Sequence, residues 1–256
     1  MSFVPDMDQW VNTHFVDVPA LIEIEVGPLA GKSVLDVGCG EMLISLGMLG
    51  RGAASVTALD IKPVAPLIEG ATQRIEKAGF SIRDRLNHLN PMQYAGVKMP
   101  FPDNTFDIIV SWGVFEHITD VLGVLREIRR TLKPDGVSFI KVYPWFHSFY
   151  GSHLSDYTPE SFSHLIYDRS QMRTIVEANV DSNPQLGADF VLGHLWEEYE
   201  TLNGYSANMF YRAVKEAGFS RDVWKLISHV HDLSKAPPGV ELSELMISGT
   251  ETLLHK

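Results

Sequence analysis

Residues 34–40 read Val-Leu-Asp-Val-Gly-Cys-Gly, and twenty residues after the second glycine an apolar run ends at Asp60. The apolar residues of the first stretch predict a buried strand over residues 33–37, and the glycines predict a sharp turn into a helix. A second buried strand is expected over residues 54–59, with the Asp60 carboxylate directly after it. This order of strand, glycine turn, helix and strand is typical of an open α/β sheet.

The glycine turn and Asp60 together predict a nucleoside-binding site. Glycines let the backbone approach a ligand closely, because no side chain stands in the way. The helix that follows offers free backbone N–H groups to a carboxylate-bearing or anionic ligand. A carboxylate at the tip of the next strand suits the two hydroxyl groups of a ribose. The candidate cofactor residues here are Gly38, Cys39, Gly40, Asp60 and Ile61, the last either against the adenine or in the core.

Two residues near the turn distinguish between nucleoside cofactors. The dinucleotide fingerprint requires a glycine three residues after Gly40, and this position is Leu43. Asp36 would repel a pyrophosphate, but it tolerates a ligand that carries an ammonium or sulfonium group. These residues favour S-adenosylmethionine over a nicotinamide dinucleotide. A nicotinamide-dependent oxidoreductase is the alternative.

Four segments in series resemble the motifs of class I S-adenosylmethionine-dependent methyltransferases. They are residues 34–40, 100–110, 114–120 and 132–136. The resemblance implies an α/β fold with a doubly wound, seven-stranded, mostly parallel sheet of the Rossmann-like type. It also implies S-adenosylmethionine as the cofactor, a place for Asp36 in the cofactor site, and transfer of a methyl group to a small-molecule acceptor.

The chain departs from this family's pattern at two places. Met42 stands where the family often has a further glycine, and no acidic residue follows the third strand, which we expect over residues 86–89. Strand ends of open α/β sheets are where ligands gather. Our further candidates for the cofactor site are Asn90, Pro91 and Met92 at the adenine, and Ser111 and Trp112 near the methionine part.

Residues 144–200 interrupt the α/β pattern. They are rich in aromatic residues and histidines, and the segment is too long for a plain loop. We expect a mostly helical cap over the acceptor site, inserted into a Rossmann-like domain made of residues 1–143 and 201–256. The other elements expected are one or two helices over residues 6–27, broken near Pro19, a helix over residues 206–217, and an edge hairpin from residues 221–230 and 242–253.

Methyl transfer is an in-line displacement on a sulfonium methyl, so the protein mainly aligns the acceptor and excludes water. A hydroxyl acceptor gains from a base within reach, and histidine is the usual choice. The candidate bases are His153 in the cap and His117 after the fourth strand, although His117 is also placed to be hydrogen-bonded within the fold. The candidate acceptor-pocket residues are Tyr143, Trp145, His147, Tyr157 and His164, each with a purely structural role as its alternative.

The cap histidines at 147, 153 and 164 are six and eleven residues apart, and these spacings fit no common zinc pattern. No metal site is therefore expected, although the spacing leaves open a divalent ion bound by carboxylates. Residues 151–154 and 202–204 loosely resemble methyltransferases of sugars and natural products, without naming an acceptor. We expect the methyl group to go to an oxygen atom of such a compound, with nitrogen and carbon as the alternatives. A non-catalytic cofactor-binding module with the same fold is the third alternative, and the intact glycine turn argues against it.

The chain of 256 residues has a net charge of −11. Nucleic acids and anionic membranes both require a basic face, so neither is expected as a partner. No apolar run approaches a membrane span, and no secretory signal is visible. The single cysteine, Cys39, cannot form an intrachain disulfide. We expect a cytoplasmic enzyme that acts on a small molecule; whether it forms a homodimer stays open.

Overall fold

Seven strands form one sheet in the computed structural model, which describes residues 7–96, 98–182, 186–229 and 232–256. The strand order is β3-β2-β1-β4-β5-β7-β6; β1 to β5 pair in parallel, and β7 runs antiparallel to both of its neighbours. The predicted seven-stranded, mostly parallel sheet is therefore confirmed. The strands are β1 (Ser33–Val37), β2 (Ser55–Asp60), β3 (Leu89–Gln93), β4 (Phe106–Trp112), β5 (Leu132–Val142), β6 (Arg221–Ser228) and β7 (Ile247–His255).

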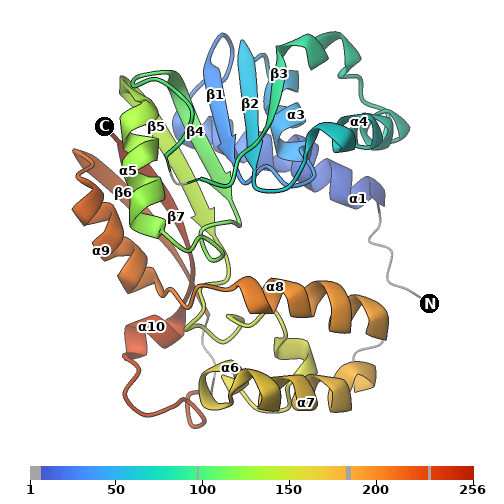
Figure 1. Cartoon of the computed structure of the whole chain (residues 1–256), viewed down its shortest axis with the longest axis vertical. Coiled ribbons are helices and arrows are strands. Elements are labelled where there is room, and N and C mark those ends of the chain that lie inside the picture. Colours follow the sequence, from blue (N-terminus) through green and yellow to red (C-terminus); the bar gives the residue numbers. More distant parts are fainter. Residues whose placement is uncertain (1–6, 97, 183–185, 230–231) are drawn as a thin grey trace.

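Helices cover both faces of this sheet (Figure 1). Val34 of β1 belongs to the apolar cluster on one face, and the next residue, Leu35, belongs to the cluster on the other. Successive side chains of a strand point to opposite faces, so a strand that is buried on both sides needs an unbroken apolar run. The covering helices are α1 (Met7–Val11), α2 (Val18–Val26), α3 (Leu43–Gly50), α4 (Ile68–Lys77), α5 (Val121–Thr131) and α9 (Ala207–Ala217).

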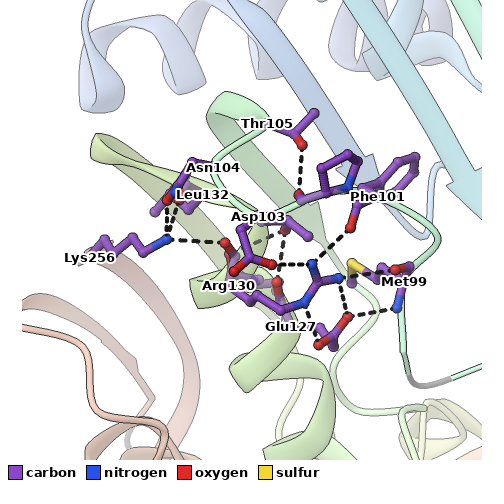
Figure 2. A network of polar contacts seen from close by, with 12 residues as sticks. Met99, Phe101, Asp103, Asn104, Thr105, Glu127, Arg130, Leu132 and Lys256 are labelled. Atoms are coloured by element: carbon purple, nitrogen blue, oxygen red, sulfur yellow. Dashed lines mark hydrogen bonds and ion pairs between the residues drawn. The ribbon is translucent and has the colours of Figure 1, made fainter.

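The loop that leads into β4 is held against the end of α5 (Figure 2). The Arg130 guanidinium donates to the carbonyl oxygens of Met99 (3.1 Å) and Phe101 (2.8 Å), and it pairs with the Glu127 carboxylate at 2.7 Å. Glu127 also accepts the N–H of Met99 at 2.8 Å, and Lys256 donates to the carbonyl oxygen of Arg130 at 3.1 Å. This network fixes the amino end of β4, and thereby the position of its carboxyl end.

Residues between β5 and α9 form a group of short helices with an apolar cluster of its own, which includes Leu154, Met172 and Trp196. Figure 1 shows α6, α7 and α8 beyond the carboxyl ends of β4 and β5. Whether they cover an acceptor stays a prediction. The elements are a 3₁₀ turn (Ser155–Tyr157), α6 (Ser163–Ile166), α7 (Arg169–Asn179), a second 3₁₀ turn (Val180–Ser182), a π-helical turn (Phe190–Leu195) and α8 (Trp196–Thr201).

Two expected element boundaries were wrong, one of a helix and one of a strand. The N-terminal helix does not break at Pro19, because a π-helical turn (Asn12–Asp17) joins α1 to α2, and such a wide turn relieves the crowding that a proline ring causes. In the edge hairpin, Leu242–Met246 forms the short helix α10 instead of a strand, so β7 begins only at Ile247. The predicted antiparallel pairing of the hairpin is confirmed, although residue 230 lies outside the described residues.

The third strand begins three residues later than expected. Residues Arg83–His88 form a 3₁₀ helix, and β3 runs from Leu89 to Gln93 with Pro91 inside it. Proline has no N–H to donate, so it is tolerated in a strand at the edge of a sheet. Since β3 is such an edge strand, Pro91 does not end it. No helix among the described residues is long and apolar enough to cross a membrane.

Candidate functional site

The glycine turn after β1 packs between β2 and the loop that follows β4. The N–H groups of Gly38 and Cys39 donate to the carbonyl oxygen of Leu59, at 2.8 and 3.2 Å. Gly38 has a φ of +79°, and an added Cβ would lie 2.4 Å from a methyl carbon of Val114. Around Gly40, whose φ is +49°, an added Cβ would meet nothing within 4 Å. The turn is therefore closed on one side and open on the other, where a ligand can approach its backbone.

The Asp60 carboxylate lies directly against this turn. It accepts the N–H of Gly40 at 2.9 Å with one oxygen and the N–H of Lys62 at 2.9 Å with the other. Each carboxylate oxygen can accept two hydrogen bonds, so both keep capacity for a hydroxyl group. The next residue, Ile61, is 66% exposed and offers an apolar surface beside Asp60. The structure thus brings together these predicted cofactor residues.

Asp36 lies below the turn, inside β1, and is only 2% exposed. Burial raises the pKa of this carboxyl to about 7; a hydrogen bond from Ser45 opposes the rise, and the nearby Asp60 charge adds to it. The Ser45 hydroxyl donates to Asp36 at 2.6 Å. Sequence reasoning missed Ser45, although it stands nine residues after Asp36 on the helix that the glycine turn begins.

The expected adenine border moves because β3 begins later. Asn90, Pro91 and Met92 pair with β2 inside the sheet, so they do not follow the strand. Gln93 takes that place: it ends β3, pairs with Asp60, and its side-chain amide donates to the carbonyl oxygen of Ile61 at 3.1 Å. Gln93 is thus a candidate that sequence reasoning missed.

Ser111 and Trp112 end β4 as predicted. The buried Ser111 hydroxyl donates to the carbonyl oxygen of Val37 at 2.9 Å, which ties the end of β4 to the start of the glycine turn. The Trp112 ring lies under the Lys141 ammonium, 4.2 Å from its centre. These contacts place the backbone of both residues beside the turn.

Glu116, His117 and His153 form a cluster in which one donor atom of each lies within 4.8 Å of the others. Glu116 is 2% exposed, and burial raises its pKa to about 8. Burial lowers the pKa of His117, the Glu198 charge opposes this, and Lys62 adds to it. Lys62 follows Asp60 by two residues, so its effect on the pKa of His117 indicates that the cluster lies near the end of β2 that carries Asp60.

His153 reaches the cluster from the segment after β5, at a residue with a φ of +59°. Burial lowers its pKa to about 4, and its Nε2 atom has no hydrogen-bond partner among the described residues. The Oε2 atom of Glu116 also lacks one within that part of the chain. The structure therefore brings together the two predicted base candidates, with rings 5.9 Å apart, and adds Glu116, which sequence reasoning did not single out.

Asn203 holds the loop that carries this cluster. Its side-chain amide donates to the carbonyl oxygens of Phe115 (2.7 Å) and Ile118 (2.8 Å), and its own N–H donates to the carbonyl of Glu116 at 2.8 Å. Asn203 thus satisfies three carbonyl groups of this turn, two through its side chain and one through its backbone N–H.

The predicted acceptor-pocket residues are dispersed. Trp145 is fully buried and donates to Thr250 at 3.1 Å, and His164 is buried and bonds the carbonyl oxygen of Phe146 at 2.7 Å. His147 pairs with Glu244 at 3.1 Å. Tyr157 is 2% exposed, and its hydroxyl has no hydrogen-bond partner among the described residues. Tyr143 is 38% exposed. None of the five belongs to the cluster.

Residues 35–140 match the methyltransferase domain family. The chain is 35% identical over 118 residues to a ubiquinone biosynthesis O-methyltransferase from Actinobacillus pleuropneumoniae, covering 46% of this chain and 48% of that protein. It is 38% identical over 120 residues to a sterol 24-C-methyltransferase from Gibberella zeae, covering 47% of this chain and 29% of that protein. The chain thus spans about half or less of the length of the curated relatives it matches.

The whole fold is similar to that of a SAM-dependent methyltransferase from Aquifex aeolicus, with a TM-score of 0.50 and 18% identity over 99% of this chain and 100% of that one. The four motifs that suggested the family all lie within or next to the matched residues. The open space beside Gly40 and the remaining acceptor capacity of Asp60 fit a ligand that carries a ribose. Residues 35–140 of this chain form a methyltransferase domain, and the chain as a whole has the fold of an S-adenosylmethionine-dependent methyltransferase.

Proposed function

We propose that the protein transfers a methyl group to an oxygen atom of a small-molecule acceptor, and that Glu116, His117 and His153 manage the acceptor's proton. Bound S-adenosylmethionine supplies an activated methyl group on a sulfonium centre. The proposal is supported above all by the position of the cluster in the loops that follow β4 and β5, the first of which packs on Gly38 of the glycine turn through Val114. In open α/β sheets, the carboxyl ends of the strands are where substrates meet cofactors.

The chemistry assigned to the cluster follows from what a hydroxyl acceptor must lose. The acceptor oxygen forms a bond to the methyl carbon while the carbon–sulfur bond breaks, and the hydroxyl proton leaves to a neighbouring group. The buried Glu116, His117 and His153 side chains can bind that oxygen or take its proton. A neutral amine or a carbon acceptor attacks with its own electron pair and can lose its proton after the transfer. Such acceptors need a base less during the attack than a hydroxyl group does, and this favours oxygen.

The acceptor would lie between the cluster and the helices that follow β5. Those helices exclude water from a reacting centre only if they stay packed against one another. Their own apolar cluster stabilises this packing. The acidic net charge of −11 disfavours a polyanionic acceptor, because like charges repel. We place the protein in the cytoplasm on the grounds that its single cysteine is free and buried.

A turnover assay with methyl-labelled S-adenosylmethionine tests the proposal. We expect release of S-adenosylhomocysteine in the presence of hydroxyl-bearing acceptors such as phenols and sugars, and label on oxygen in the product. His153→Gln should lower kcat at least about tenfold while the dissociation constant of S-adenosylhomocysteine stays the same. Label found only on nitrogen or carbon atoms, across a panel that includes all three acceptor types, would contradict an oxygen acceptor.

A further inference from the structure

We propose that Glu116, His117 and His153 bind a divalent transition-metal ion such as Zn²⁺, and that an open position on this ion holds the acceptor oxygen. With the ion bound, the three side chains act on the acceptor's proton through the ion, which makes the bound hydroxyl more acidic so that it releases its proton to water. The metal site rests on the geometry of these three residues alone; its role toward the acceptor rests on the proposed function. Two imidazoles and one carboxylate with a free coordination position are a donor set that catalytic zinc and non-haem iron sites share. The spacing along the chain did not indicate this site, because His153 comes from a distant segment.

Two of the three side chains carry a buried and unsatisfied atom that can bind a metal ion. The Oε2 atom of Glu116 and the Nε2 atom of His153 have no hydrogen-bond partner among the residues described. Glu116 as a whole is 2% exposed, so its carboxylate cannot turn to bulk water. Buried polar atoms without partners are rare, and an unfilled ion site is one of the reasons for them. A cation at this place would satisfy both atoms at once.

The third donor, His117, is held in the tautomer that a metal requires. The Thr201 hydroxyl uses its one hydrogen to donate to the carbonyl oxygen of Glu198, at 2.8 Å. Since Thr201 can then only accept, the 2.8 Å contact with Nδ1 of His117 assigns the proton to Nδ1. The Nε2 atom of His117, which lies 3.8 Å from Oε2 of Glu198, carries a lone pair when the ring is neutral. Such a fixed second nitrogen is the usual support of a metal-binding histidine.

The backbone also holds the donors in place. His153 sits at a φ of +59°, a left-handed conformation that side-chain-bearing residues adopt only when their surroundings impose it. Asn203 fixes the loop of Glu116 through three hydrogen bonds. The donor atoms lie within 4.8 Å of one another, while metal–ligand bonds of about 2.0–2.2 Å would bring them roughly 3.5 Å apart. Small rotations of the three side chains, with the backbone unchanged, would therefore bring the donor atoms to the spacing that a bound ion requires.

Titration of the chelator-treated full-length protein with Co²⁺, followed by its visible absorption, and with Zn²⁺, followed by calorimetry, tests the site. We expect one ion per chain. Mutation of a residue that hydrogen-bonds a metal ligand typically lowers metal affinity about 10–100-fold. Glu116→Gln and His153→Gln each remove a ligand, so each should weaken binding by about 100-fold or more. His88→Gln, which changes an exposed histidine away from the cluster, is the matched control and should leave the affinity unchanged.

Binding of S-adenosylhomocysteine is measured on the same samples, so that the two proposals fail separately. Wild-type protein that shows no saturable Co²⁺ or Zn²⁺ binding, but binds S-adenosylhomocysteine and turns over, overturns the metal site and leaves the proposed function. Equal ion affinity in wild type, Glu116→Gln and His153→Gln overturns it as well. If one variant fails to fold by circular dichroism, the other decides. The Asp60→Ala variant should keep full Co²⁺ binding, because Asp60 contributes no donor.

Discussion

The Asp60 carboxylate accepts backbone N–H groups from Gly40 and Lys62 and keeps capacity for two further hydrogen bonds. In Asp60→Ala, the two ribose hydroxyls of the cofactor lose a charged acceptor. A hydrogen bond to a charged group contributes about 1.5–3 kcal/mol, so the affinity for S-adenosylhomocysteine should fall at least about tenfold. Calorimetry measures this, with the exposed Asp135→Ala as a control that should bind normally. An unchanged dissociation constant in Asp60→Ala would remove this residue from the site.

Single residues also show what the sequence could and could not reveal. The glycine turn and Asp60 were predictable, because they lie close together along the chain and each follows a strand with an unmistakable apolar run. The cluster was not, since His117 and His153 come from the two loops that follow β4 and β5 and meet only when these strands lie side by side. Motif resemblance drew attention to His117, but nothing in the sequence paired it with His153.

Among the elements, the N-terminal helical stretch crosses α3 at a contact that requires glycine. An added Cβ at Gly47 would lie 2.3 Å from the carbonyl oxygen of Phe15 and 2.5 Å from the ring of Pro19. Pro19 has no N–H to donate to the Phe15 carbonyl in the α-helical pattern, and Gly47 of α3 packs against this carbonyl.

Gly47→Ala should therefore destabilise the protein by about 1–3 kcal/mol, because overpacking outweighs the better helix propensity of alanine. Urea unfolding measures this change. Gly70→Ala in α4 is the matched control: an added Cβ there would meet nothing within 4 Å, so we expect a gain of up to about 1 kcal/mol. Equal stability changes of the same sign in both variants would mean that the contact between α3 and the N-terminal helices is looser than described.

The boundaries of elements were harder to predict than their existence. The third strand was expected to end at residue 89, yet it continues through Pro91, because an edge strand tolerates a residue without an N–H. A helix break was expected near Pro19, yet a π-helical turn accommodates the proline and the helical stretch continues. In both cases, the position of the element in the folded molecule determines where the element ends, and the local sequence does not reveal this position.

For the whole molecule, stability in acid depends on how the amino ends of three parallel strands are joined. Asp107 of β4 accepts hydrogen bonds from the N–H (2.9 Å) and hydroxyl (2.6 Å) of Ser33 in β1, and from Lys133 in β5 (2.8 Å). Burial alone would raise the pKa of Asp107, but the hydrogen bonds from Lys133 and Ser33 outweigh it and lower the pKa to about 2.

Because the folded-state pKa lies below the ordinary value of 3.8, this stabilisation is complete above about pH 4 and is lost as the pH falls through about 2. The contribution is of the order of 2 kcal/mol. In wild type, the free energy of unfolding should fall across this window, and in Asp107→Asn the share due to this group should be absent. Parallel pH profiles for the two proteins would show that Asp107 does not carry this pH dependence.

The central claim is that the carboxyl edge of this sheet binds S-adenosylmethionine through the glycine turn and Asp60. Calorimetric titration of the wild-type protein with S-adenosylhomocysteine and, separately, with NAD tests it most directly. The account predicts one S-adenosylhomocysteine bound per chain and NAD binding that is far weaker, because Asp36 opposes a pyrophosphate and Leu43 stands where the dinucleotide fingerprint needs glycine. Saturable NAD binding without binding of S-adenosylhomocysteine would contradict it.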